Sequence, residues 1–226
     1  GENEIVMADV GIQDMEEGGL SCEYCAYAWN LDGTPVRGWP KECTQFSSND
    51  NVSSWLEGGA TLSDLDHDGV MESIFSYRGS YNNYPPSVIV LSGDGQNFGE
   101  FPYVFKPFNG LKPVFAFGPV AVGDLDCDSE KEIVGILELE NPPSPYREKY
   151  LYILSMPGVL KEMVPLFQFA DSSKFHPILI NTDDDCNLEI FAKSYSRLSH
   201  FLDYRQGKYQ IQWSKVHDRQ KNSYPA

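Results

Sequence analysis

The chain has 226 residues, of which 41% are hydrophobic and 13% aromatic, so it can bury a full core and is not disordered by composition. Its 33 acidic residues outnumber its 17 basic residues and give a formal net charge of −16, which argues against nucleic acid or an anionic membrane as the partner. No segment approaches the ~18 consecutive apolar residues of a transmembrane helix, and the N-terminal residues lack the basic and apolar regions of a signal peptide.

Short apolar runs along the chain predict β-strands, because they are rich in β-branched and aromatic residues and are too short for helices. In chain order, the predicted strands are 59–62, 73–77, 87–91, 101–105, 120–123, 133–137, 150–154, 177–180, 190–193 and 210–213. Proline-rich stretches at 82–86 and 141–145 fall between strands and are expected to form exposed loops. Four strands in about 60 residues is the content of a propeller blade, so the predicted class is all-β with four-stranded antiparallel blades.

Three acidic segments repeat in one register, and each lies between two predicted strands. They read DLDHDGVME, DLDCDSEKE and NTDDDCNLE, at 64–72, 124–132 and 181–189. At a spacing of about 60 residues, a glutamate recurs at position 9 as Glu72, Glu132 and Glu189. A fourth copy is partial, since GENEIV at the start of the chain matches the second half of such a segment, with Glu4 at position 9. A fixed period of this kind indicates a repeat architecture.

The oxygen-bearing side chains of these segments match the needs of Ca²⁺. This ion takes 6–8 oxygen ligands, and alternate residues of a tightly curled loop can turn their carboxylates inward together. With side chains at positions 1, 3, 5 and 9 and a backbone carbonyl at position 7, the predicted ligands are Asp64, Asp66, Asp68, Val70, Glu72, Asp124, Asp126, Asp128, Glu130, Glu132, Asn181, Asp183, Asp185, Asn187 and Glu189. We expect two to three structural Ca²⁺ ions per chain, with the third loop the weakest because Asn181 removes one negative charge.

The acidic loops have two other possible interpretations. An EF-hand shares the DxDxDG pattern but needs helices on both sides and a glutamate at position 12, where this chain has Phe75, Gly135 and Ala192. Acidic surface turns without metal remain the alternative, and three loops in one register with an acid at position 9 each time favour the metal.

The segment FGPVAVGDLD at 117–126 resembles the FG-GAP repeat, also called the VCBS-type repeat, of integrin α-subunit propellers. The segment 27–40 is similar to the strand-turn-strand unit that closes many such repeats, with Asp32-Gly33 as its hairpin turn. The resemblance covers nearly the whole chain. It implies a β-propeller with calcium loops at one face, in proteins of the cell surface or exterior that mostly bind other proteins or glycans.

The resemblance also predicts how the chain is divided. We expect a single propeller segment over 1–226, with a partial first repeat at 1–58 that includes the closing hairpin and full repeats at 59–115, 116–172 and 173–226. Propellers of this kind usually have seven or so blades. The segment is therefore expected to belong to a larger propeller, or to pack against copies of itself or a neighbouring chain that cover its open strand edges.

Five cysteines are present, at Cys22, Cys25, Cys43, Cys127 and Cys186. The CxxC pair leaves three interpretations open: half of a zinc site with Cys43 as a third ligand, a redox pair, or disulfide-bonded residues. Disulfides fit best, with Cys43 paired to Cys22 or Cys25. Cys127 and Cys186 occupy equivalent neighbouring loops and can pair if their Cα atoms lie within ~7 Å.

Export and partner binding rest on few residues. Asn51-Val52-Ser53 is an N-glycosylation sequon in a polar stretch, and any export signal is expected upstream of Gly1. Tyr81 and Tyr84 lie in a polar, proline-rich loop and are the predicted partner contacts. The histidines are scattered and most carboxylates belong to the loops, so no catalytic set can be named and no enzyme is expected.

Together these patterns predict an extracellular or cell-surface calcium-binding module for adhesion or assembly, with a protein or glycan partner and no membrane insertion. The alternatives are a structural subunit of a surface filament and a glycan-binding or polysaccharide lyase-like propeller.

Overall fold

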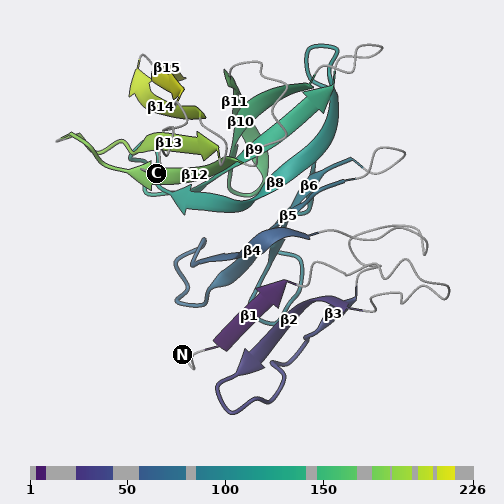
Figure 1. Ribbon diagram of the computed structural model, residues 1–226. Coiled ribbons are helices and arrows are strands. Elements are labelled where there is room, and N and C mark those ends of the chain that lie inside the picture. The colour runs from purple at the N-terminus through teal and green to yellow at the C-terminus, as the bar shows by residue number, and fades with distance from the viewer. Residues whose placement is uncertain are drawn as a thin grey trace, which may run out of the picture.

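The computed structural model describes residues 4–8, 24–42, 56–79, 85–140, 147–166, 175–183, 185–194, 198–205 and 208–216. Every helix or strand among these residues is a β-strand, which confirms the predicted all-β class. The strands form antiparallel sheets (Figure 1). The first sheet contains β1 (Glu4–Ala8), β2 (Tyr24–Asn30) and β3 (Lys41–Glu42). The second contains β4 (Leu56–Ser63), β5 (Glu72–Tyr77), β6 (Ser87–Leu91) and β7 (Tyr103–Val104).

Two further sheets complete the described fold. The third contains β8 (Lys112–Gly123), β9 (Glu132–Glu140), β10 (Arg147–Ser155) and β11 (Val159–Leu166). The fourth contains β12 (Phe175–Ile180), β13 (Glu189–Ser194), β14 (Leu198–Arg205) and β15 (Lys208–Val216). In each sheet the strands lie side by side in chain order, as in a simple meander. The four-stranded antiparallel sheets that the repeat predicts are therefore present.

The sheets stack face to face in a row, through contacts of β1 with β4, β4 with β8, and β8 with β12. A hydrophobic cluster fills each interface. In β5, Ile74 faces the third sheet and Phe75 the first, and in β9 Ile133 and Val134 divide in the same way. Strands buried on both faces read as continuous apolar runs, which is why these segments lack a polar alternation. Each such side chain contributes roughly 1.5–3 kcal/mol on full burial.

The hairpin turn predicted at Asp32-Gly33 is present. The Gly33 amide donates to the Asn30 carbonyl at 2.9 Å, and Gly33 adopts a φ of 83°, which a residue without a Cβ reaches most readily. The Asp32 carboxylate accepts hydrogen bonds from the amide and the hydroxyl of Thr34, at 2.9 and 2.6 Å. These two bonds close the turn behind β2.

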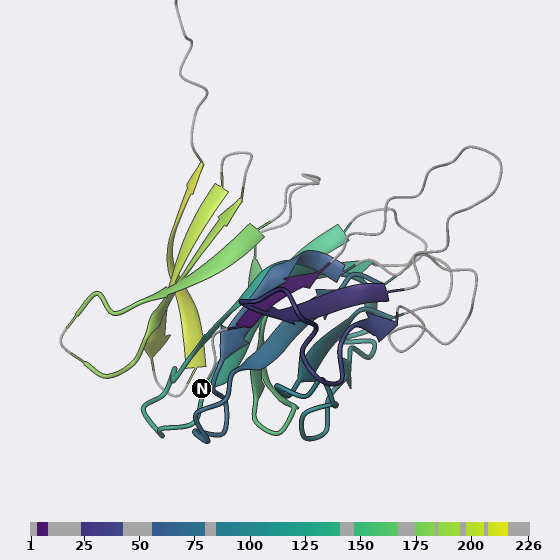
Figure 2. The same ribbon diagram turned by 90° about the horizontal axis from the view of Figure 1, so that it is seen from below.

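The two ends of the row differ from its interior. In the part of the chain that the structure describes, the first and fourth sheets lie at opposite ends of the row, each with one face packed against its neighbour (Figures 1 and 2). None of the described residues forms a helix long and apolar enough to cross a membrane.

Candidate metal centres

The three acidic segments form the loops that join the first and second strands of the second, third and fourth sheets. They lie on one side of the molecule, at the left in Figure 1. In each loop the position 9 glutamate is the first residue of the second strand, at Glu72, Glu132 and Glu189. The strand therefore fixes this carboxylate, and the acidic loop curls around it.

The position 9 glutamates are almost completely buried, with exposed fractions of 2%, 1% and 1%. One oxygen of each, Oε2, accepts a hydrogen bond from the backbone amide at loop position 2. The donors are Leu65 at 2.7 Å, Leu125 at 2.9 Å and Thr182 at 2.6 Å. This bond ties the loop to the strand and orients the carboxylate.

The aspartates at positions 1 and 5 use part of their carboxylates to curl the loops. At position 5, Oδ1 accepts the amide of position 7 in all three loops, at 2.7 Å from Val70, 2.8 Å from Glu130 and 2.9 Å from Asn187. At position 1, Asp64 accepts the Gly69 amide at 3.1 Å and Asp124 accepts the Ser129 amide at 3.0 Å. The position 5 bonds reach two residues on and are Asx turns, and together with the position 1 bonds they hold a tight curve while leaving other carboxylate oxygens available.

The loops bring carboxylates together into groups that could hold a metal ion. In each group, one oxygen per residue lies within 4.8 Å of the others, and the members are Asp64, Asp66 and Glu72; Asp124, Asp126 and Glu132; and Asp183, Asp185 and Glu189. Clustered carboxylates repel one another, and a nearby cation offsets that repulsion. Oxygen-only groups of this kind suit hard ions such as Ca²⁺.

Buried carboxylate oxygens without a donor fit the same conclusion. Among the described residues, Asp64 Oδ1, Asp124 Oδ1, Asp126 Oδ1 and Glu189 Oε1 are buried and accept no hydrogen bond. A buried polar atom without a partner is costly, and a carboxylate oxygen more so. A metal ion would supply what these four atoms lack.

The predicted ligands are only partly gathered. The close groups contain positions 1, 3 and 9 in the first two loops and positions 3, 5 and 9 in the third, so Asp68 and Asp128 lie outside them. In the third loop the Asn181 amide nitrogen donates to the Asp185 carbonyl at 2.8 Å, so this side chain braces the loop. A ligand role for the position 7 carbonyls of Val70, Glu130 and Asn187 stays a prediction.

Burial shifts the titration of two position 9 glutamates. It raises the pKa of Glu72, and the neighbouring carboxylates of Asp66, Asp68 and Asp64 act in the same direction against the Leu65 hydrogen bond. Burial also raises the pKa of Glu132, against the opposing hydrogen bond from Lys161. At both positions burial therefore disfavours the ionised carboxylate, and a cation beside it would favour that form again.

Neighbouring loops touch through the same pair of positions. His67, at position 4 of the first loop, contacts the Ser129 carbonyl at position 6 of the second loop, at 3.2 Å from Nε2. Cys127, at position 4 of the second loop, forms a disulfide with Cys186 at position 6 of the third, with the Cα atoms 5.7 Å apart. The disulfide predicted between these cysteines is confirmed. The repeat of one geometry indicates that the loops stack in a regular row.

Tyr209 adds a link between the second and third loops. This β15 residue is 4% exposed, and its hydroxyl lies 3.0 Å from the Leu125 carbonyl and 2.7 Å from the Leu188 carbonyl. A single hydroxyl can donate to either acceptor, so it holds both loops close.

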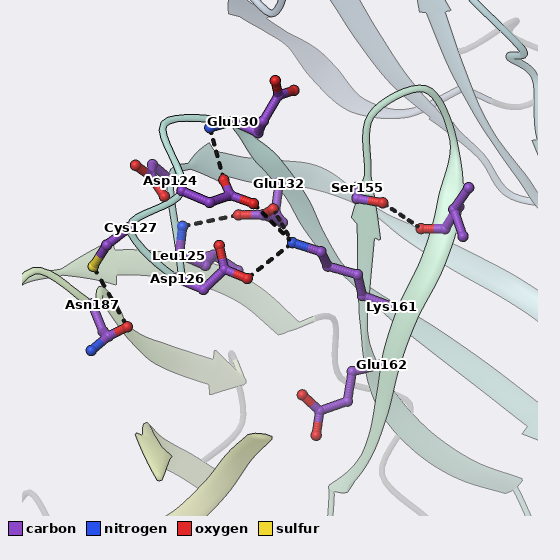
Figure 3. Close-up of polar contacts among 12 residues, drawn as sticks. Asp124, Leu125, Asp126, Cys127, Glu130, Glu132, Ser155, Lys161, Glu162 and Asn187 are labelled. Carbon is purple, nitrogen blue, oxygen red and sulfur yellow. Dashed lines mark hydrogen bonds and ion pairs between the residues drawn. The ribbon is translucent and has the colours of Figure 1, made fainter. Parts of the chain in front are cut away.

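Lys161 is the site residue that the sequence did not reveal. It lies on β11, and its ammonium is 2.6 Å from Glu132 Oε1, 3.0 Å from Asp126 Oδ2 and 3.9 Å from Asp128 Oδ2 (Figure 3). Nothing in the sequence connects a lysine in the fourth strand of a sheet with the loop between the first two. The contact depends on how the four strands of the third sheet are arranged in space.

Several predicted residues lie outside the described part of the chain. They are the sequon residue Asn51, the predicted partner contacts Tyr81 and Tyr84, and the cysteines Cys22 and Cys43. Cys25 lies in β2, but its side chain is also outside the description. The glycosylation, the tyrosine contacts and the pairing of these cysteines stay predictions.

Comparison with protein-family models, curated proteins and solved structures finds no match for this chain.

Proposed function

We propose that this chain is an extracellular, calcium-stabilised propeller segment of the FG-GAP type that serves in adhesion or assembly. The calcium sites are supported most directly by Glu189, which is 1% exposed and whose Oε1 accepts no hydrogen bond. Its other oxygen is held by the amide and hydroxyl of Thr182, at 2.6 Å each. Burial removes this carboxylate from water and its hydrogen bonds fix its position, so a cation bound at Oε1 would offset the cost of burying its charge.

The proposed role of the ions is structural. Each cluster lies where the first strand of a sheet gives way to the second, so an ion there ties the loop to the sheet. An ion that binds only the folded chain stabilises it by mass action, by ~2.7 kcal/mol per site at a hundredfold excess over Kd. The disulfide between Cys127 and Cys186 supports an exported location, since such bonds persist in oxidising compartments.

Calcium stoichiometry tests the metal sites directly. Protein dialysed against buffered Ca²⁺ is expected to retain two to three ions by atomic emission, and Glu189→Gln is expected to retain one fewer. Glu100→Gln is the matched control, because Glu100 is exposed and lies outside the acidic groups. Retention of no calcium by the unmodified chain would contradict the proposal.

The assembly role is supported by the face that the first sheet turns away from its neighbour. The register pairs Ile5 with Trp29 and Met7 with Tyr27, which places these side chains on one face, opposite the buried Ala28. Ile5 and Met7 are 49% and 54% exposed, and the rings of Tyr27 and Trp29 stack with their centroids 5.2 Å apart. This face is apolar and only partly covered.

The fourth sheet has a similar arrangement at the other end of the row. One register row contains Leu179, Ile190, Leu202 and Ile211, all packed into the core. The adjacent row contains Ile178, Phe191 and Phe201, and Ile178 is 50% exposed. The equivalent faces of the second and third sheets are covered by another sheet. We propose that a second copy of this chain covers the end faces in the same way.

Sedimentation velocity tests the assembly proposal. The unmodified chain is expected to self-associate as its concentration rises, and Ile178→Glu is expected to weaken that association. Val104→Glu, an exposed position on the short strand β7, serves as the control. A monomer at all concentrations would contradict self-assembly and would leave the calcium sites unaffected.

A further inference from the structure

Among the described residues, the second loop differs from the other two in holding a lysine ammonium against its carboxylates. The first loop also receives an ammonium, but Lys131 contacts it at the Asp64 backbone carbonyl, at 2.6 Å, and forms no ion pair with the carboxylates described for that loop. Lys161 comes from β11, and its ammonium points between the loop carboxylates and contacts Glu132 Oε1 and Asp126 Oδ2 at 2.6 and 3.0 Å (Figure 3). These lengths are those of strong, charge-assisted hydrogen bonds. The Asp128 carboxylate is also within 4 Å, at 3.9 Å. One ammonium therefore serves three acidic residues of one loop.

The equivalent atoms in the neighbouring loops lack this partner. Within the described residues, each ion pair to a loop carboxylate involves Lys161 and the second loop. The comparison is sharpest at position 9, where Glu132 Oε1 receives the ammonium while Glu189 Oε1 is buried with no partner. The same atom of the same repeated residue is thus provided with a cation in one loop and left without one in another.

We infer that Lys161 is a built-in cation of the second loop, which it holds folded without metal and from which Ca²⁺ must displace it. This inference rests on the proposed calcium binding of the loops. An ion bound to Glu132 and Asp126 would lie at roughly 2.3–2.6 Å from oxygens that the ammonium already contacts. Two cations that share such oxygens lie a few ångströms apart and repel strongly, so they compete.

The surroundings of Lys161 allow such an exchange. Its side chain is 34% exposed, whereas Glu132 is 1% exposed, so the ammonium can swing into solvent while the carboxylate stays in place. Asp124 Oδ1 and Asp126 Oδ1 are buried without a partner and remain available to an incoming ion. The second loop is therefore a weaker calcium site that binds only at higher Ca²⁺, and the first and third loops are the tight ones. This ranking replaces the one expected from ligand charge alone, which made the third loop the weakest, because Lys161 both offsets a negative charge of the second loop and occupies its oxygens, whereas Asn181 only removes one charge from the third.

The second loop lies between the first and third loops, so a lysine that stabilises it also affects its two neighbours. It is joined to the first loop by the contact of His67 with Ser129 and to the third by the disulfide of Cys127 with Cys186. A central loop that keeps its shape without metal supports both neighbours before they bind calcium. The sites are then unequal by construction, although their sequences look alike.

Calorimetric calcium titration of Lys161→Met tests the inference. Methionine keeps the length of the stem and removes the charge. The unmodified chain is expected to show two tight sites and one weak site, and the variant is expected to tighten the weak site by about tenfold or more, because one competing positive charge is gone. Lys161→Arg, which keeps a cation, is expected to behave as the unmodified chain does.

Lys112→Met is the matched control for net charge. Lys112 is exposed and pairs with Glu140 at the end of β8 that lies away from the loop. This variant is expected to leave all three affinities unchanged. Three equal sites in the unmodified chain, or no change on Lys161→Met, would overturn the inference.

A readout in chelator separates this inference from the proposed function. Amide hydrogen exchange at Leu125, whose N–H donates to Glu132, is expected to be slower than at Leu65 and Thr182, and Lys161→Met is expected to abolish the difference. If the chain binds no calcium but this pattern holds, the proposed function and the displacement of Lys161 by Ca²⁺ both fail, and only the role of Lys161 in holding the second loop stands. Equal exchange at the three amides in the unmodified chain would overturn the inference itself.

Discussion

The position 9 glutamate braces its own loop with one oxygen, and we propose that its other oxygen faces a cation. In the third loop the proposed cation would come from solution, whereas in the second loop the Lys161 ammonium lies 2.6 Å from Glu132. The same substitution is therefore expected to have opposite effects in the two loops when metal is absent.

In chelator, Glu189→Gln is expected to leave the free energy of unfolding unchanged or to raise it by up to about 1 kcal/mol, because an amide removes the buried, unpartnered charge. Glu132→Gln is expected to lower it by about 1 kcal/mol, since Lys161, whose side chain is about one third exposed, loses its closest partner. Urea unfolding of both variants measures the difference. Equal shifts of the same sign would contradict the two roles.

His200 on β14 gives a separate prediction for the response to acid. It is fully buried, Nδ1 lies 2.7 Å from Ser214 Oγ, and burial lowers its pKa below the ordinary 6.5. The folded chain therefore keeps the ring neutral while the unfolded chain takes a proton. Stability is expected to fall as the pH drops below about 6.5, by at most about 1.4 kcal/mol per pH unit from this residue.

His200→Gln is expected to flatten that part of the pH profile, because glutamine does not titrate in this range. Urea unfolding at pH 7.5 and 5.5 gives the comparison. His67→Gln is the control, since His67 is exposed in the first loop. An identical pH dependence in His200→Gln and the unmodified chain would exclude His200 as a source.

At the scale of the strand, Gly135 shows how packing between strands constrains the sequence. It interrupts the apolar run of β9 and pairs with Tyr152 on β10, and a Cβ at this position would collide with the Tyr152 ring. Tyr152 is fully buried and cannot move aside. Gly135→Ala is expected to destabilise the chain by roughly 1–3 kcal/mol through overpacking.

Gly59→Ala is the matched control, because Gly59 also lies in a strand, in β4, and a Cβ there would meet no atom within 4 Å. It is expected to change stability by no more than about 0.5 kcal/mol. Thermal unfolding of the two variants measures both effects. A tolerated alanine at position 135 would contradict the close packing of this ring on the strand.

The strands that the sequence predicted are those with long apolar runs, such as β5 and β9, whose faces are both buried. β11 and β14 were missed because both mix charged and apolar residues, as in VLKEMVPL, and give no clean period. The strand predicted at 101–105 is shorter, Tyr103–Val104, since Pro102 has no amide hydrogen for a ladder. Local pattern therefore finds strands with unbroken apolar runs better than strands of mixed composition.

The candidate site was also only partly predictable from the sequence. The predicted metal ligands could be recognised, because their spacing lies within a segment of nine residues. The Cys127–Cys186 pair was also predictable, because equivalent loops of neighbouring repeats were expected to lie close. Lys161 and the His67–Ser129 contact were not, since they depend on how whole sheets curl and stack.

For the whole molecule, the disulfide is the covalent link between the third and fourth sheets. It spans 59 residues of sequence, and closing a loop of that size typically stabilises a fold by about 2–4 kcal/mol. The double variant Cys127→Ala/Cys186→Ala is expected to melt at a lower temperature and to bind calcium more weakly at the second and third loops. Calorimetry with and without a reductant measures this, and the variant itself is expected to be unaffected by the reductant at that site.

Thermal unfolding in excess Ca²⁺ and in chelator, with bound calcium counted on the same sample, tests whether the acidic loops bind structural calcium. We expect chelator to lower the melting temperature strongly, with two ions held tightly and a third only at higher Ca²⁺. An unchanged melting temperature with no bound calcium would mean that the acidic loops are turns without a metal and would contradict the account.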